Sequence, residues 1–324
     1  MPRAIRIHSH GGPEVLGLEQ VTVPAPGRGE VRLRQTAVGL NFIDVYDRTG
    51  LYPMPLPSGL GREAAGVVIE AGPGVKSVQV GDRVAYVHSQ PGAYADERIM
   101  PAGRLVKVPD GVSDRQAAAV MLKGLTAWYL LRRTYRVRKG DPVVIHAAAG
   151  GVGLLAVQWA RHLGAEVIAV TGTGEKAEMA REHGAHHTVL LGRGDLAERV
   201  REITGGRGVP VVYDSIGKDT FLSSLDCLRP LGLMVTYGNA SGPVPPFSPL
   251  ELSKRGSLYL TRPTLFTYIA SRADLSRGAE ELFDVIASGA VQVRIGHTYP
   301  LADAALAHLE LEARRTTGST VLIP

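Results

Sequence analysis

The first 123 residues carry their hydrophobic positions in short segments. The segments "EVRLRQTAVGL" and "AAGVVIEAGPGV" have apolar or alternating positions, and "VGDRVAYV", "GAYADERIM" and "LVKVPDGVS" follow at short intervals. Gly, Pro and Asp turns separate them. Closely spaced short strands bounded by such turns are typical of a barrel or a sandwich. The pattern therefore predicts a β-rich N-terminal unit.

From about Arg136 the pattern changes to an alternation of strands and helices. A buried strand, "PVVIHAAA", precedes the helix "GVGLLAVQWARHLG". One face of that helix carries the apolar residues Val152, Leu155, Trp159 and Leu163. The strands "AEVIAVTG", "HTVLL", "VPVVYDSIG" and "LMVTYGN" follow, with the helices "GEKAEMAREHGA", "DLAERVREITGG" and "FLSSLDCLRPLG" between them. This alternation predicts an α/β fold with a doubly wound parallel sheet.

The C-terminal segment does not continue the alternation. A helix near 276–289, a strand near 291–299 and a terminal helix and strand remain. We expect these elements to pack on the N-terminal unit.

A turn of alanines and glycines joins the first strand of the alternating region to its helix. Aligned to the dinucleotide-binding pattern G-x-G-x-x-G, it has Ala148 at the first position, then Gly150 and Gly153, with Gly151 between them. Such a turn lets a pyrophosphate approach the backbone N–H groups at the N-terminus of the helix. Because a strand precedes the turn and a helix follows it, we predict a dinucleotide site rather than only a tight helix–sheet contact.

The end of the second strand bears on the choice between NAD and NADP. An NAD site usually carries an acid about 20 residues after the glycine turn, where it holds the ribose 2′-hydroxyl. Here residues 170–174 are Val-Thr-Gly-Thr-Gly, without an acid. The glycines, Gly172 among them, leave room for a 2′-phosphate that Lys176 would pair. The alternative is that Lys176 is a solvated lysine, but the missing acid favours NADPH.

Composition and charge narrow the class of protein. The 324 residues carry a net charge of +5 at pH 7, but Lys and Arg are interleaved with acids, as in "EKAEMAREHG". This interleaving favours solvated helix faces over a nucleic-acid surface. No apolar run approaches the roughly 20 residues of a membrane span, and the N-terminus lacks the apolar core of a signal peptide, so we expect a cytoplasmic protein. The single cysteine, Cys227, excludes an internal disulfide framework, and we expect a buried structural thiol.

Several stretches form a more specific pattern when taken together. They are "NFIDVYDRTGLYP", "LPSGLGREAAG", "KGLTAWYLLR", "HAAAGGVG", "VVYDSIG", "TYGNASGPV", "SLYLTRPTL" and the closing "RRTTGSTVLIP". Over essentially the whole chain they resemble the zinc-free quinone oxidoreductases, the zeta-crystallin-like branch of the medium-chain dehydrogenase/reductase superfamily. The resemblance implies a GroES-like catalytic domain over 1–123, completed by 267–324. It also implies a Rossmann domain over 124–266 and a homodimer.

The residues at the positions of zinc ligands favour a protein without metal. By the resemblance, Asn41 stands where zinc-dependent relatives have a Cys, and Arg62 where they have the His before Glu63. His88 has no Cys or His neighbour at ligand spacing. A catalytic zinc site needs about three protein ligands, so we predict none. Without a Lewis acid, hydride transfer suits an acceptor that is already electrophilic, such as a quinone or an enone.

The resemblance also implies roles for individual residues. Asn41, Tyr46 and Tyr52 are the expected catalytic residues, and the two tyrosines would hydrogen-bond the acceptor oxygen unless they only pack in an apolar cleft. The expected cofactor contacts are Asn41, Phe42, Lys123, Thr126, Gly151, Val152, Gly172, Lys176, Gly238, Asn239, Ser241, Arg262 and Arg314. Leu191 replaces a Tyr that relatives often carry near the adenosine, which leaves the strength of the NADPH preference open.

These observations predict an NADPH-dependent quinone reductase that transfers hydride without a metal. Two alternatives stay open. An enone or 2-alkenal reductase would also deliver hydride to a conjugated acceptor. An RNA-binding protein is the alternative from another class, because some relatives bind AU-rich RNA and the pI of about 9.3 permits a polyanion partner.

Overall fold

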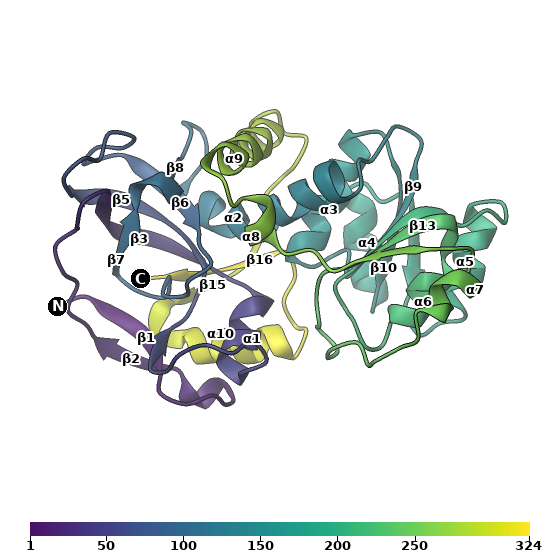
Figure 1. Cartoon of the computed structure of the whole chain (residues 1–324), viewed down its shortest axis with the longest axis horizontal. Helices are drawn as coiled ribbons and strands as arrows, with labels where there is room; N and C mark the ends of the chain where they lie inside the picture. The colour runs from purple at the N-terminus through teal and green to yellow at the C-terminus, as the bar shows by residue number, and fades with distance from the viewer. The chain divides into compact units, whose positions relative to one another are not determined.

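The computed structural model describes residues 1–324 and divides them into two compact units. The first contains Met1–Leu125, Ile269–Ala287 and Val293–Pro324, and the second contains Thr126–Tyr268 and Ser288–Gln292. Both chain ends therefore belong to the first unit, as their labels in Figure 1 show. None of the helices combines the length and the apolar character that crossing a membrane requires.

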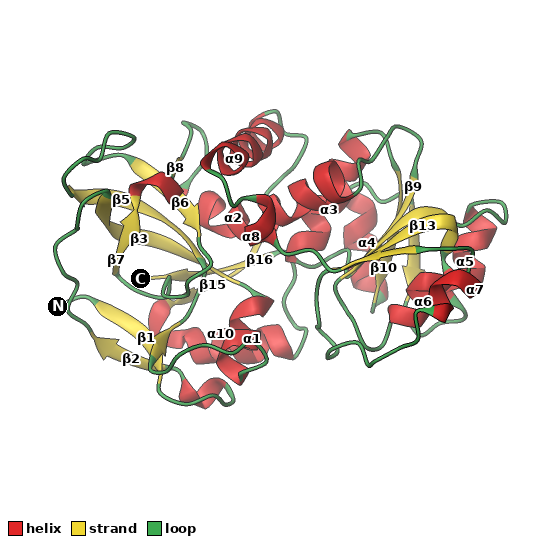
Figure 2. Ribbon diagram, viewed as in Figure 1, coloured by secondary structure: helices red, strands yellow, loops and turns green.

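The first unit contains two sheets, whose strands are yellow in Figure 2. A three-stranded sheet has the order β2-β1-β4, and a seven-stranded sheet has the order β15-β16-β3-β5-β6-β8, with β7 paired to β3. All pairs are antiparallel except β15 with β16. The strands are β1 (Arg3–Ile7), β2 (Gly17–Gln20), β3 (Glu30–Leu40), β4 (Ser58–Gly59), β5 (Glu63–Ala71), β6 (Arg83–Val87), β7 (Glu97–Pro101), β8 (Val106–Lys107), β15 (Ile295–Pro300) and β16 (Ser319–Ile323). The predicted β-rich unit is confirmed.

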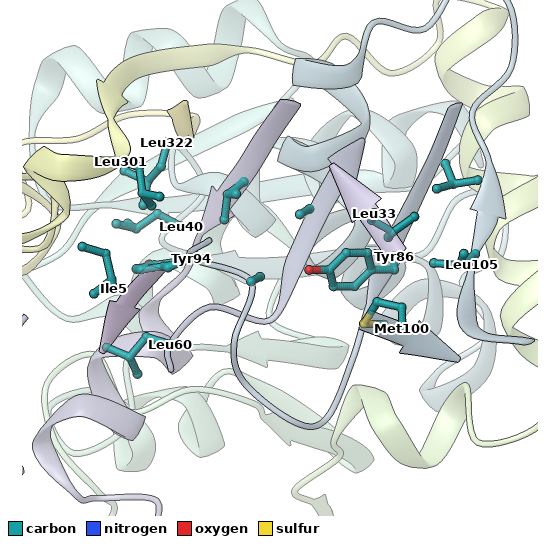
Figure 3. Close-up of a cluster of buried hydrophobic side chains, with 14 of the residues drawn as sticks. Ile5, Leu33, Leu40, Leu60, Tyr86, Tyr94, Met100, Leu105, Leu301 and Leu322 are labelled. Carbon is teal, nitrogen blue, oxygen red and sulfur yellow. The ribbon is translucent and has the colours of Figure 1, made fainter. Parts of the chain in front are cut away.

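The core of the first unit joins residues from both ends of the chain. One cluster of buried side chains contains Leu33 and Leu40 of β3, Tyr86 of β6, and Leu301 and Leu322 from the C-terminal segment (Figure 3). Each is at most 1% exposed, so the C-terminal strand is part of the fold of this unit. The helices here are α1 (Phe42–Thr49), the first part of α2 (Asp114–Tyr129), α9 (Arg272–Ala287) and α10 (Ala304–Glu312), with short 3₁₀ turns at Pro13–Val15, Ala102–Arg104 and Leu301–Asp303.

The second unit is built on one parallel sheet of six strands in the order β11-β10-β9-β12-β13-β14. Counted within the unit this is 3-2-1-4-5-6, the order of a doubly wound dinucleotide-binding sheet. The predicted α/β class is confirmed. The strands are β9 (Pro142–His146), β10 (Glu166–Thr171), β11 (His187–Leu190), β12 (Val209–Asp214), β13 (Leu228–Thr236) and β14 (Tyr259–Thr261). The helices are α3 (Gly151–His162), α4 (Gly174–Glu182), α5 (Leu196–Ile203), α6 (Phe221–Asp226), α7 (Leu250–Lys254) and α8 (Leu265–Tyr268), and a π-helical turn covers Leu130–Thr134.

Two parts of the second unit differ from the prediction. Helix α6 ends at Asp226, and residues 228–232, expected as the end of a helix and a turn, begin β13 instead. The register of β12 on β13 shifts between Val209 and Val211. This irregularity accommodates Pro230, which has no N–H for a sheet. The three residues of β14 are too few to carry a periodic pattern, so the sequence does not predict this strand.

Candidate functional site

The glycine turn of the second unit leaves the start of α3 open to an anion. Strand β9 ends at His146, and α3 begins at Gly151 with no side chain capping it. The backbone N–H groups of the first turn of a helix have no intrahelical partners. A Cβ on Gly153 would lie 2.2 Å from the carbonyl oxygen of Ala147, so only glycine permits the helix to come this close to the strand. Residues and backbone therefore fit a dinucleotide pyrophosphate.

The end of the neighbouring strand β10 carries no acid. Thr171 ends the strand, Gly172 follows, and Thr173 caps α4 by accepting the N–H of Lys176 at 3.3 Å. A Cβ on Gly172 would meet no atom within 4 Å, so the backbone is open at this point. No carboxylate lies at the end of the strand itself, and the first turn of α4 carries both Glu175 and Lys176.

The loop after β13 is fixed by its own side chains. Arg262 Nη1 donates to the carbonyl of Gly238 at 3.1 Å, and the amide oxygen of Asn239 accepts from Arg262 Nη2 at 3.0 Å. Ser241 Oγ donates to the carbonyl of Ile216 at 2.9 Å. The structure thus joins three expected cofactor residues, Gly238, Asn239 and Arg262, at the carboxyl end of the sheet. Open parallel sheets bind their ligands at this edge.

A buried polar cluster at the ends of β9 and β12 was not foreseen. Asp214 Oδ2 accepts from Thr220 and Ser224 at 2.7 and 2.8 Å, and His146 Nε2 lies 2.9 Å from Ser224 Oγ. Asp214 Oδ1 also accepts the N–H of Ile216 at 2.7 Å. These bonds fix the two strand ends beside the glycine turn. The one signal in the sequence is an acid directly after a buried strand, in "VVYDSIG".

In the first unit, Asn41 precedes α1 and is held by two carboxylates. Its backbone N–H donates to Asp44 Oδ2 at 2.9 Å, and its side-chain Nδ2 donates to Glu63 Oε1 at 2.8 Å. Lys123 Nζ lies 3.1 Å from the same Glu63 oxygen and donates to the Leu40 carbonyl at 3.0 Å. Glu63 is completely buried and Lys123 is 6% exposed. Lys123 is therefore a buried partner of Glu63 and not a surface charge at the end of a helix.

The expected tyrosines belong to an aromatic cluster around α1. The ring centroid of Tyr46 lies 5.7 Å from that of Phe42 and 5.2 Å from that of Tyr52. Aromatic packing is thus present, whatever bonds the hydroxyls form. Arg314 is exposed in the first unit with a left-handed φ of 59°, and Thr126 is buried in the part of α2 that belongs to the second unit.

The positions expected for zinc ligands are used for other contacts. Arg62 Nη2 and Nε lie 2.7 and 2.8 Å from the carboxylate of Asp47, and a guanidinium is a donor that offers no lone pair to a metal. His88 Nδ1 accepts the N–H of Gln90 at 3.1 Å. The structure has no group of three or more His, Cys, Asp or Glu that could hold a metal ion. The absence of metal from the reaction stays a prediction. Cys227 is confirmed as a buried thiol, and burial raises its pKa to about 12.

Comparison with known proteins gives the chain its relatives. An alcohol dehydrogenase GroES-like domain matches residues 27–110, and a zinc-binding dehydrogenase family matches 151–285. A quinone oxidoreductase of Pseudomonas aeruginosa is 52% identical over 100% of both chains. A 2-haloacrylate reductase of a Burkholderia species is 51% identical over 100% of this chain and 99% of its own.

Solved structures agree with this relationship. The crystal structure of Escherichia coli quinone oxidoreductase complexed with NADPH has a TM-score of 0.98 and 49% identity, covering 99% of this chain and 100% of its own. A mycobacterial structure complexed with NADPH has a TM-score of 0.96 and 47% identity, covering 99% and 100%. The chain belongs to the quinone oxidoreductase family of the medium-chain dehydrogenase/reductase superfamily, with a GroES-like domain and a Rossmann-type sheet.

Proposed function

We propose that this protein is an NADPH-dependent quinone reductase. The observation that carries the proposal is the open N-terminus of α3 beside a strand, β10, whose last residue, Thr171, is followed by Gly172 instead of an acid, with Lys176 in the first turn of the next helix. Relatives of about half identical sequence are named quinone oxidoreductases, and two solved relatives contain NADPH. When bound, NADPH supplies the hydride.

In the second unit, we assign the pyrophosphate to the backbone N–H groups of Gly151 and Val152. Gly172 leaves space for the 2′-phosphate and Lys176 provides a positive charge for it. Arg314, which belongs to the first unit, is a further residue that we assign to the cofactor. The remaining proposed contacts in the second unit are Thr126, Gly238, Asn239, Ser241 and Arg262. The hydrogen bonds that join Gly238, Asn239 and Arg262 support a preformed loop, which reduces the entropy lost on binding.

In the first unit, Asn41 and Phe42 contact the nicotinamide in this proposal. Tyr46 and Tyr52 hydrogen-bond the acceptor oxygen and position it for hydride transfer. Lys123 has three N–H donors, and with two of them occupied by Leu40 and Glu63 we assign the third to the cofactor. In this proposal, residues 1–123 and 267–324 form the domain that binds the acceptor. Residues 124–266 form the domain that binds the dinucleotide.

A second candidate function is reduction of a conjugated carbon–carbon double bond. The 2-haloacrylate reductase of the Burkholderia species is as similar to this chain as the quinone oxidoreductases are. Both reactions add hydride to an electrophilic conjugated acceptor. We propose the quinone as the better substrate because more of the similar relatives carry that name.

We also propose a cytoplasmic homodimer. Strand β14 forms one edge of the six-stranded sheet, and its Tyr259 is 62% exposed. Leu250 in α7 is 64% exposed. An exposed sheet edge with apolar side chains can pair with a second copy of itself. Sedimentation of the purified protein tests this proposal, and a monomer at micromolar concentration would contradict it.

A matrix of cofactors and acceptors tests the activity. Steady-state rates should be measured on metal-stripped protein with NADPH and NADH against 1,4-benzoquinone, a simple enone and 2-chloroacrylate. We expect the highest kcat/KM with NADPH and the quinone. A large advantage for the enone or the haloacrylate would select the second function, and no nucleotide oxidation by any quinone would refute the first. A gel-shift titration with AU-rich RNA tests the remaining alternative, since binding at physiological salt that NADPH displaces would support it.

A further inference from the structure

Four buried side chains of the first unit form a continuous series of hydrogen bonds. Asp44 and Arg48 belong to α1, His308 belongs to α10, and Tyr94 lies just before β7. Arg48 Nη1 is 3.2 Å from His308 Nδ1, His308 Nε2 is 3.1 Å from Tyr94 Oη, and Tyr94 Oη is 2.9 Å from Asp44 Oδ2. Each residue is at most 1% exposed. We call these four residues the α1 relay.

Only one arrangement of protons satisfies the α1 relay. Arg48 is a donor only, so His308 Nδ1 accepts and the proton of the neutral ring is on Nε2. Burial and the charge of Arg48 keep the ring neutral by lowering the pKa of His308 to about 3. Tyr94 accepts from Nε2–H and donates its own proton to Asp44. In every hydrogen bond of the relay, the donor is therefore on the side of the Arg48 guanidinium and the acceptor is on the side of the Asp44 carboxylate.

Protonation of Asp44 disrupts this arrangement at either oxygen. Oδ1 is buried without a partner, so a proton there has no acceptor, and it leaves Oδ2 an uncharged and weaker acceptor for Tyr94 and the Asn41 N–H. If the proton is on Oδ2, Tyr94 must accept a hydrogen bond from Asp44 and turn its own O–H toward His308 Nε2. The proton of the His308 ring must then move to Nδ1, where it would face the N–H groups of Arg48. Arg48 is also fixed by Glu312, whose Oε1 is 2.8 Å from Nη2. The relay is thus strongest while Asp44 is ionised, because its hydrogen bonds to Oδ2 are then charge-assisted.

The carboxylate at the end of the relay also fixes the start of α1. Asp44 Oδ2 accepts the backbone N–H of Asn41, and the first turn of α1 carries Phe42 and leads to Tyr46. We propose that the α1 relay is a positioning device for the reductase, in which Tyr94 and His308 hold Asp44 ionised and thereby hold Asn41 and Tyr46 in place. Binding of the acceptor then weakens when Asp44 is protonated. This inference rests on the proposed function for its kinetic consequence.

Opposing effects place the protonation of Asp44 near neutral pH. Burial and the neighbouring Asp47 raise its pKa to about 7, against the lowering effects of the Asn41 N–H, the Tyr94 hydroxyl and Arg62. Above this pH the hydrogen bonds that Asp44 accepts from Tyr94 and from the Asn41 N–H are charge-assisted, and below it they are weaker. The charged and titratable groups that face the relay are Asp47, Arg48, Arg62, Glu63, His308 and Glu312.

The pH profile of kcat/KM for 1,4-benzoquinone tests the proposal. Tyr94→Phe keeps the ring but removes a hydrogen bond to the charged carboxylate, so the acid limb should move to higher pH by about one unit or more. Asp44→Asn should abolish the limb. His308→Gln can accept from Arg48 and donate to Tyr94 and should keep the wild-type profile, whereas His308→Leu should not. Tyr135→Phe is the matched control, because Tyr135 also donates to a carboxylate, that of Asp141, at 3.1 Å.

Hydrogen exchange of the wild-type protein provides a readout that needs neither activity nor a variant. After correction for intrinsic rates, the amides of residues 41–49 should exchange faster at pH 6 than at pH 8. An acid limb unmoved by Tyr94→Phe, or pH-independent exchange of these amides, would overturn the relay. Absence of quinone reduction in every protein, with exchange still dependent on pH, would overturn the proposed function and leave the relay supported.

Discussion

Replacement of His308 by phenylalanine should destabilise the protein by an amount that depends on pH. Burial, and then the charge of Arg48, lower the pKa of His308 from 6.5 to about 3. Between these values the unfolded state binds a proton that the folded state does not. The contribution of the neutral His308 ring to the free energy of unfolding of the wild type is therefore fully present above about pH 6.5. It is lost as the pH falls toward 3. The variant has no such proton to bind.

The size of the pH dependence follows from the single proton that His308 binds in the unfolded state and not in the folded state. The free energy of unfolding of the wild type minus that of His308→Phe should rise by about 1.4 kcal/mol per pH unit between pH 4 and 6 and level off above pH 7. Urea denaturation followed by circular dichroism at several pH values measures it. Leu301→Ala in the same core is the control, because its cost of about 2–5 kcal/mol involves no titrating group and should not vary with pH. A His308→Phe difference that is equally constant from pH 4 to 7 would refute a neutral buried histidine.

Three further substitutions test the two parts of the site. Gly153→Ala places a Cβ against a carbonyl oxygen of the turn and should weaken NADPH binding at least tenfold by calorimetry, whereas Gly103→Ala, which meets no atom within 4 Å, should not. Lys176→Glu should raise KM for NADPH more than for NADH, and equal effects would make Lys176 only a surface charge. Glu63→Gln leaves the ammonium of Lys123 buried without its counterion and should cost about 3–5 kcal/mol of stability, so a cost below 1 kcal/mol would contradict the buried pair.

The fold was predictable because its signals are periodic and local. Alternation of apolar strands and amphipathic helices after Arg136 predicts the parallel sheet, and the glycine turn predicts which strand comes first in it. The prediction was wrong at residues 228–232, because a strand that contains Pro230 and an irregular register has no regular pattern to detect. The sequence also did not predict strand β14, because three residues are too few to show a periodic pattern.

The site was predictable to a smaller extent. The turn at Gly150–Gly153 and the acid-free end of β10 are local features, and the structure shows both. The partners of the buried charges are not local. Lys123 and Glu63 are 60 positions apart, and Arg48 and His308 are 260 positions apart. Neither pair leaves a spacing that a single sequence can show, because each contact depends on how the first unit folds.

The start of α1 is held by such distant contacts between side chains. By the resemblance, zinc-dependent relatives have ligands at the positions of Asn41 and Arg62. Here Asn41 is held by Asp44 through its backbone and by Glu63 through its side chain, while Arg62 holds Asp47 of the same helix. These contacts come from segments on both sides of β4. Asn41 and Arg62 therefore fix α1 through hydrogen bonds to the buried carboxylates of Asp44 and Asp47, and such bonds are strongest while the carboxylates are ionised.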